Sequence, residues 1–163
     1  MDFSSFKHAQ AFESFFAHVS QTAPFDVLTV PPDLWENLYL LEVRQDGGLI
    51  VRLAGAQVRD VFGRDLRGLD LRQVSHGGDS ARVTAAYDQV VAERRAAVMR
   101  RRVHLPTKRV TRVIECGFAP LFDAAAPDRS TAPVNRILGC FFALEAGVRS
   151  ADYGKDDFAL HLG

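Results

Sequence analysis

Cysteine is scarce in this chain, and motifs for metal binding, nucleophilic catalysis and phosphate binding are missing. Only Cys116 and Cys140 occur among 163 residues, too few for a disulfide framework. Each lies in a predicted apolar strand, which favours two reduced thiols in the core. The alternative is a redox pair on neighbouring strands, which requires Cα atoms within about 7 Å. Metal-ligand spacing, a nucleophile triad and a phosphate-binding loop are all missing, so the sequence favours binding over catalysis.

Net charge and long apolar runs are also missing. The 20 basic residues balance 20 acidic ones, so the protein as a whole is not drawn to nucleic acid or to a membrane surface. No run approaches the roughly 20 apolar residues of a membrane span. The first helix carries Lys7 and Glu13 beside its aromatics, unlike a secretory signal. We therefore expect a cytoplasmic protein without membrane contact, and the composition, 47% apolar and 25% charged, suits one globular domain.

The first segment is rich in phenylalanine at helical spacing, which predicts an amphipathic N-terminal helix. Such an apolar stripe must be covered. Either it packs on the outer face of its own sheet or it buries against a second copy of the chain. The candidate dimer-interface residues on this stripe are Phe12, Phe15, Phe16 and Val19.

The remaining pattern predicts strands and helices in a definite order. Two strands are joined by a tight turn at Asp46-Gly47-Gly48, a strong hairpin signal. Short helical segments that end at Gly63 and Gly68 follow, then a longer helix and three more strands. This order predicts an α+β fold, with a five-stranded antiparallel sheet covered by a helical insert after the second strand. The predicted strands are 38–44, 49–54, 97–105, 109–119 and 136–145, and the predicted helices are 56–62 and 80–95.

Three short motifs carry a family resemblance. Pro31-Pro32-Asp33-Leu34 precedes the first strand, Arg52-Leu53-Ala54-Gly55 ends the second, and Gly63-Arg64-Asp65-Leu66-Arg67-Gly68 follows the short helix. In this order residues 25–145 resemble a PAS domain, of the subfamily common in single-domain alphaproteobacterial proteins. Ala56 departs from the pattern, because threonine often follows the Ala-Gly step. The resemblance implies a sensory or protein-interaction module in which the sheet and the helical insert enclose a small pocket.

Strand 97–105 raises the question of which side chains reach that pocket. Met99 shares a face with Arg101, and if this face points inward, Arg101 needs a carboxylate or an anionic ligand, because an unpaired buried charge is costly. The same question applies to Arg112, between Val110 and Ile114. An arginine in the pocket favours a carboxylate ligand. The candidate ligand-binding residues are Arg101, Arg112, Tyr39 and Phe62.

The cofactor is unknown from the sequence. His76 and His104 are the candidates for a haem ligand, but solvated histidines are favoured. Neither cysteine lies in the helical insert, where the photochemistry of a flavin-type domain needs one. Haem and flavin are therefore disfavoured, and no metal site is expected.

Eight basic residues and no acidic one lie between Arg94 and Arg112. The favoured interpretation is a solvated hairpin whose charges resist edge-to-edge strand pairing. The alternative is a surface for an anion or an acidic partner. Nucleic acid is the weakest form of that alternative, because no aromatic residues interleave for stacking.

These observations predict a non-enzymatic PAS-like module that binds a small molecule or a partner protein and signals in trans, with a homodimer as its expected assembly. The predicted units are a helix and connector over 1–24, the domain over 25–146 and a tail over 147–163. One alternative is a purely structural dimerisation module without a ligand. Another is a small enzyme of the ketosteroid isomerase type, in which Glu115 acts as base with Tyr39 or Tyr87 as oxyanion donor.

Overall fold

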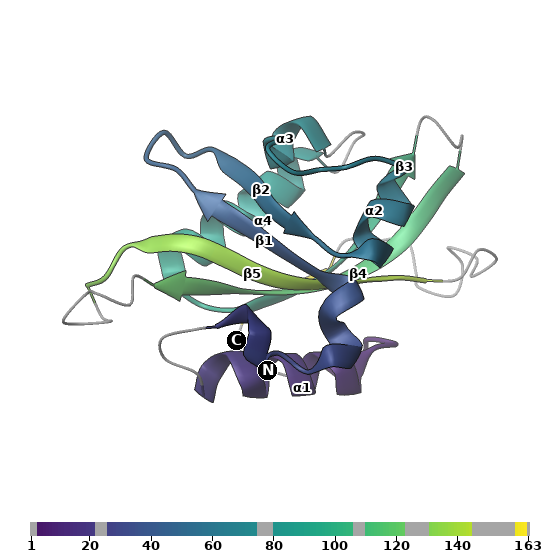
Figure 1. The fold of residues 1–163 in the computed structure, drawn as a ribbon, viewed down its shortest axis with the longest axis horizontal. Coiled ribbons are helices and arrows are strands. Elements are labelled where there is room, and N and C mark those ends of the chain that lie inside the picture. Colours follow the sequence, from purple (N-terminus) through teal and green to yellow (C-terminus); the bar gives the residue numbers. More distant parts are fainter. Residues whose placement is uncertain are drawn as a thin grey trace.

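A single antiparallel sheet organises the chain, with helices on both of its faces (Figure 1). The computed structural model describes residues 3–21, 26–74, 80–105, 110–122, 131–144 and 159–162. The strand order is β2-β1-β5-β4-β3-β6. The five predicted strands and the α+β class are confirmed, and a sixth strand from the tail pairs with β3. The strands are β1 (Leu38–Val43), β2 (Leu49–Ala54), β3 (Ala97–Leu105), β4 (Val110–Phe122), β5 (Val134–Ala143) and β6 (Ala159–Leu162).

The inner face of the sheet is covered by the helical insert (Figure 1). This insert comprises α2 (Ala56–Phe62), α3 (Leu71–Val74) and α4 (Ser80–Glu93). As predicted, α2 ends at Gly63, whose φ of 68° is left-handed. α4 ends two residues earlier than predicted, because Arg94 adopts a φ of 59°. Val83, Ala86, Tyr87 and Val90 form the buried stripe that α4 packs on the sheet.

The outer face is covered by α1 (Ala9–Gln21), which lies along the opposite side of the sheet from the insert (Figure 1). Phe12 and Phe15 are fully buried there, in a cluster with Leu138 and Cys140 of β5. Phe16 packs against the same cluster and is partly buried, as is Val19. The stripe therefore covers its own sheet, one of the two positions expected for it. Phe12 and Phe15 offer no exposed surface to a second copy, and the homodimer remains a prediction.

The two short 3₁₀ helices between α1 and β1 are η1 (Val27–Thr29) and η2 (Pro32–Asn37). They anchor the connector to the outer cluster through Val30 and Leu34. At their end, Asn37 donates a hydrogen bond to the carbonyl of Phe141 at 2.8 Å.

The two cysteines are buried and free. Cys116 of β4 belongs to the apolar cluster between the sheet and the helical insert, whereas Cys140 of β5 belongs to the cluster under α1. They lie on neighbouring strands, but their side chains leave opposite faces of the sheet, because side chains alternate along a strand. The redox-pair alternative is therefore wrong.

Two glycines let aromatic rings lie directly on the sheet, one on each face. A Cβ atom on Gly117 would stand 2.8 Å from Phe12 of α1. A Cβ atom on Gly139 would stand 2.1 Å from Cζ of Tyr39 and 2.3 Å from its hydroxyl oxygen. Tyr39 is the cross-strand neighbour of Gly139, and its ring occupies the space that a side chain would fill.

The Gly139→Ala variant should therefore be less stable than the wild type by about 1–3 kcal/mol, the usual cost of overpacking a core. In a Tyr39→Ala background the added methyl group meets no ring, so the same substitution should cost much less. Chemical denaturation of the four proteins of this double-mutant cycle measures both costs. Equal costs in the two backgrounds would show that the tyrosine ring does not require the glycine.

Candidate functional site

A small cavity lies between the inner face of the sheet and the helical insert. It offers about 30 Å³ of room for the centre of a water-sized sphere, and roughly 10–15 Å³ on this measure holds one water molecule. The cavity therefore accommodates the equivalent of about two waters. Most of its described wall is aliphatic or aromatic, and no Asp or Glu is among the described residues that line it. Its lining residues are Tyr39, Leu41, Val51, Ala54, Val58, Phe62, Leu66, Leu71, Val74, Tyr87, Arg101, Cys116 and Phe141.

Arg101 is the one cation among the described residues of this wall. Side chains alternate along β3, so Met99, Arg101 and Val103 point to the inner face, where all three are buried. Arg101 is only 5% exposed, and its Nε atom has no hydrogen-bond partner. Taking a charge out of water is costly unless a counter-charge or hydrogen bonds replace the water. The structure therefore contains a buried guanidinium that is hydrogen-bonded to the Cys116 thiol but whose Nε–H meets no acceptor among the described residues.

Two tyrosines form the polar part of the wall beside it. The hydroxyl groups of Tyr39 and Tyr87 are 2.7 Å apart, which is a hydrogen bond between two buried groups. Burial raises the pKa of both phenols, so both stay neutral. One hydroxyl hydrogen makes the bond between them, and the second remains an available donor. The ring of Tyr87 also stacks on Phe118, with ring centroids 4.4 Å apart.

Cys116 completes the polar wall. Burial raises the pKa of its thiol to about 11, although the neighbouring Arg101 guanidinium acts in the opposite direction. The thiol is therefore protonated at neutral pH, and it does not neutralise Arg101.

Three of the four residues predicted to bind a ligand meet at this cavity: Tyr39, Phe62 and Arg101. Arg112 does not line it. Arg112 is half-buried opposite Val103. What the three residues bind remains a prediction. The sequence predicts a chemical role for Tyr87 only in the enzyme alternative, but the position of Tyr87 in the apolar stripe of α4 is the signal that indicates its place in the cavity wall.

Of the two haem-ligand candidates, the structure places only the backbone of His104, which lies in β3 opposite Thr111. The side chain of His104 and the whole of His76 lie outside the described residues.

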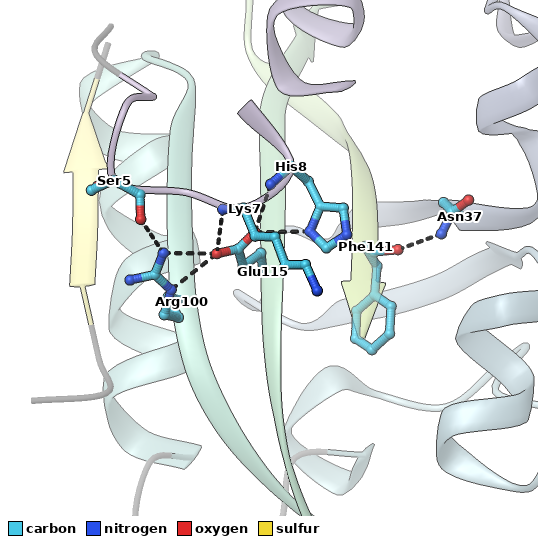
Figure 2. A network of polar contacts seen from close by, with 7 residues as sticks. All are labelled: Ser5, Lys7, His8, Asn37, Arg100, Glu115 and Phe141. Atoms are coloured by element: carbon cyan, nitrogen blue, oxygen red, sulfur yellow. Dashed lines mark hydrogen bonds and ion pairs between the residues drawn. The ribbon is translucent and has the colours of Figure 1, made fainter. Parts of the chain in front are cut away.

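A second polar cluster lies on the outer face, around the buried carboxylate of Glu115 (Figure 2). Glu115 has no exposed surface. Its Oε1 accepts hydrogen bonds from the backbone N–H of Lys7 at 3.1 Å and from Arg100 Nε and Nη2 at 3.0 and 2.8 Å. Its Oε2 accepts from the backbone N–H of His8 at 3.1 Å and from the His8 Nδ1 at 2.9 Å. This cluster, which we call the Glu115 lock, was missed by sequence reasoning because its members lie far apart in the chain.

The Glu115 lock attaches the start of α1 to β4. α1 has no acidic residue in its first turn, and the carboxylate accepts from N–H groups just before the helix begins. Free N–H groups and the helix dipole both favour a negative charge at this end. Burial opposes ionisation of Glu115, but the bonds from His8 and Arg100 outweigh it and lower the pKa of the carboxyl. Arg100 also donates to the carbonyl of Ser5 and lies over the ring of Phe6.

The enzyme alternative does not agree with this geometry. Glu115 points to the outer face, whereas Tyr39 and Tyr87 meet on the inner face. The proposed base and the proposed oxyanion donors are thus separated by the sheet.

Neither interpretation of the basic stretch holds for its central residues. Arg100 and Arg101 are buried, on opposite faces of β3, so they belong neither to a solvated hairpin nor to a continuous cationic surface. Arg102 is exposed. Lys108 and Arg109 lie outside the described residues.

The described part of the chain contains no group of three or more His, Cys, Asp or Glu side chains that could hold a metal ion. It also contains no helix long and apolar enough to cross a membrane.

The sheet order and the helical insert after its second strand are those expected of a PAS domain. A family model described as PAS domain matches residues 30–142, and the chain therefore belongs to the PAS domain family. This is a class of sensory and interaction modules. A search of curated proteins finds no match.

Solved structures show the same fold. The light-state structure of the blue-light photoreceptor Aureochrome1 LOV aligns with a TM-score of 0.53 at 11% identity, over 74% of this chain and 90% of that one. A fungal LOV domain photoreceptor aligns with a TM-score of 0.53 at 13% identity, over 88% and 99%. A light-oxygen-voltage domain studied with a flavin analogue aligns with a TM-score of 0.52 at 12% identity, over 72% and 84%. At such identities the likeness establishes the fold alone.

The Glu115→Gln variant should be destabilised by about 3–5 kcal/mol, because it leaves the buried Arg100 without its counter-charge. Glu42→Gln is the matched control. Glu42 pairs with Arg52 at 2.6 Å, but both side chains are substantially exposed, so its loss should cost about 0–1 kcal/mol. Chemical denaturation of both variants measures the difference. Similar costs for the two would show that the lock does not hold the outer layer.

The contribution of Glu115 should also depend on pH. The pKa of Glu115 is lowered in the folded protein. In the unfolded chain a glutamate has a pKa of about 4.3. Its stabilising contribution is therefore complete above that pH and is lost as the pH falls through the folded-state pKa. The gap in unfolding free energy between wild type and Glu115→Gln should narrow in acid, as followed by denaturation from neutral pH to about pH 3. A gap that stays constant over this range would contradict the assignment.

Proposed function

We propose that this PAS domain is a sensory module that binds a small molecule in the inner cavity and passes the signal to a separate protein. The observation that carries the proposal is Arg101, a buried guanidinium with an unpartnered Nε in a cavity whose described wall contains no carboxylate. A purely structural core gains nothing from such a residue, since an apolar side chain of similar length would avoid the desolvation penalty. A ligand with an acceptor group offsets that penalty only when it is bound.

The arrangement of β3 and β4 supports a route for the signal. Arg101 points into the cavity, and the preceding residue, Arg100, points to the Glu115 lock on the outer face. On β4, Glu115 likewise points to the outer face, and the next residue, Cys116, points to the inner face. A shift of β3 that improves the contacts of Arg101 therefore also shifts Arg100, and with it the N-terminal segment. Contacts of that segment with a partner protein would then respond to the ligand.

We also propose that the chain forms a homodimer. The exposed large apolar side chains among the described residues are Leu28 and Trp35, at 72% and 45% exposure. Both lie in the connector between α1 and β1, so this connector replaces the α1 stripe as the candidate interface. Sedimentation velocity of the wild type and of Leu28→Ser with Trp35→Ser tests the assembly.

A flavin is not proposed for this chain. The structural neighbours include a blue-light photoreceptor and a domain studied with a flavin analogue, but a cavity with room for about two waters is far smaller than a tricyclic ring. The same small volume favours the second candidate function, a structural interaction module whose core needs no ligand.

The ligand-free Arg101→Met variant should be more stable than the ligand-free wild type by about 1–4 kcal/mol, since it removes a buried charge that has no counter-charge in the described cavity wall. Arg100→Met is the matched control, because the neighbouring arginine on the other face loses a real partner and should destabilise the protein. Denaturation after extensive dialysis measures both variants, and native mass spectrometry of freshly purified protein detects a co-purifying molecule. Loss of stability in Arg101→Met, together with a ligand-free native mass, would favour the structural module.

A further inference from the structure

We infer that the ligand of the inner cavity is a small monocarboxylate, with its carboxylate held between Arg101 and the Tyr39–Tyr87 hydroxyl pair. This inference rests on the proposed function, since it names the chemical class of the molecule sensed. The geometry that points to it is the placement of a guanidinium with an unmatched Nε–H and of one spare hydroxyl donor in a described wall that is mostly apolar and holds no counter-charge.

The charge of the wall selects an anion. The described wall contains Arg101 as its one cation and neither Asp nor Glu, so a negative charge is attracted and is not opposed by another. Tyr39, Tyr87 and Cys116 stay protonated, because burial raises the pKa of each. One guanidinium balances one negative charge. A monoanion therefore fits better than a dianion such as phosphate.

The donors select a carboxylate among monoanions. A guanidinium presents its N–H groups as a planar fork, which matches the two oxygens of a carboxylate. The Nε–H of Arg101 belongs to that fork and has no acceptor in the structure. The tyrosine pair adds a second type of donor, since one of its two hydroxyl hydrogens is not used between Tyr39 and Tyr87.

The remaining wall selects a short apolar body. Apart from the four polar side chains, the lining consists of apolar residues from the sheet, from α2 and α3 and from the segment between these two helices, including Val58, Leu66 and Val74. A hydroxylated or charged tail would lose its water there without replacement bonds. The volume, about two waters, corresponds to acetate or propionate, and a long-chain fatty acid does not fit.

Isothermal titration calorimetry with the full chain tests this inference directly. The probes are sodium acetate and sodium propionate, their neutral isosteres acetamide and propionamide, and sodium phosphate, all at matched ionic strength. We expect saturable binding of a carboxylate and at least tenfold weaker binding of its amide and of phosphate. Arg101→Met should abolish the binding, and Tyr87→Phe should weaken it severalfold. Arg112→Met, an arginine on β4 that does not line the cavity, should leave it unchanged.

The outcomes separate this inference from the proposed function. Amides that bind as tightly as carboxylates, or carboxylate binding that survives Arg101→Met, would overturn the inference. A neutral or larger co-purifying molecule in native mass spectrometry, displaced by none of the carboxylates, would overturn it and leave the sensory function standing. Absence of any ligand, with Arg101→Met less stable than the wild type, would overturn both. Arg101→Lys keeps the charge without the planar fork, so its weaker carboxylate binding tests the same point if the methionine variant does not fold.

Discussion

The alternation of side chains along β3 and β4 is the constraint on which both polar sites depend. In the register of these strands Arg100 faces Glu115, and Arg101 faces Ile114. A strand presents consecutive side chains to opposite faces, so two adjacent arginines have opposite environments. Arg100 pairs with the Glu115 carboxylate on the outer face, while Arg101 points into a cavity whose described wall holds no carboxylate. A slip of one residue in this register would exchange the two environments and break both sites.

The Glu115 lock explains how an outer layer so rich in aromatics keeps a defined position. Rings such as Phe12 and Phe15 provide buried apolar area, but this attraction is non-directional. The carboxylate adds direction, because each of its oxygens accepts from both the N-terminal segment and a side chain. Gly117 lies two residues further along β4 on the same face and leaves room for Phe12. Hydrogen bonds thus set where the helix begins, and ring packing sets how closely it lies.

Local patterns were sufficient to predict the fold. The hairpin turn, the glycines after α2 and the apolar stripe of α4 each follow from neighbouring residues, and all were confirmed. The sites were harder because they depend on pairing over long distances. Because three consecutive residues of β3 are arginines, the alternation of polar and apolar residues does not show which face of this strand points inward. The sequence therefore leaves open whether Arg101 points into the pocket. Glu115 joins residues 107 and 108 positions away, and nothing in the local pattern signals that contact. Cys116 and Cys140 could be separated only once the faces of their strands were known.

Arg101 connects the stability of the domain with its proposed function. A guanidinium left without an acceptor raises the free energy of the ligand-free state. A molecule that supplies the acceptor removes this penalty, so the residue that weakens the empty fold strengthens the bound one. Arg101 and Arg100 are consecutive residues of β3. A shift of the strand at Arg101 therefore also moves Arg100, which holds the N-terminal segment through Glu115 and the carbonyl of Ser5. Ligand binding can then favour one arrangement of the outer layer only to the extent that the two arrangements differ in affinity for the ligand. An arginine whose Nε–H lacks an acceptor in the empty cavity is a direct way to create such a difference within a core this small.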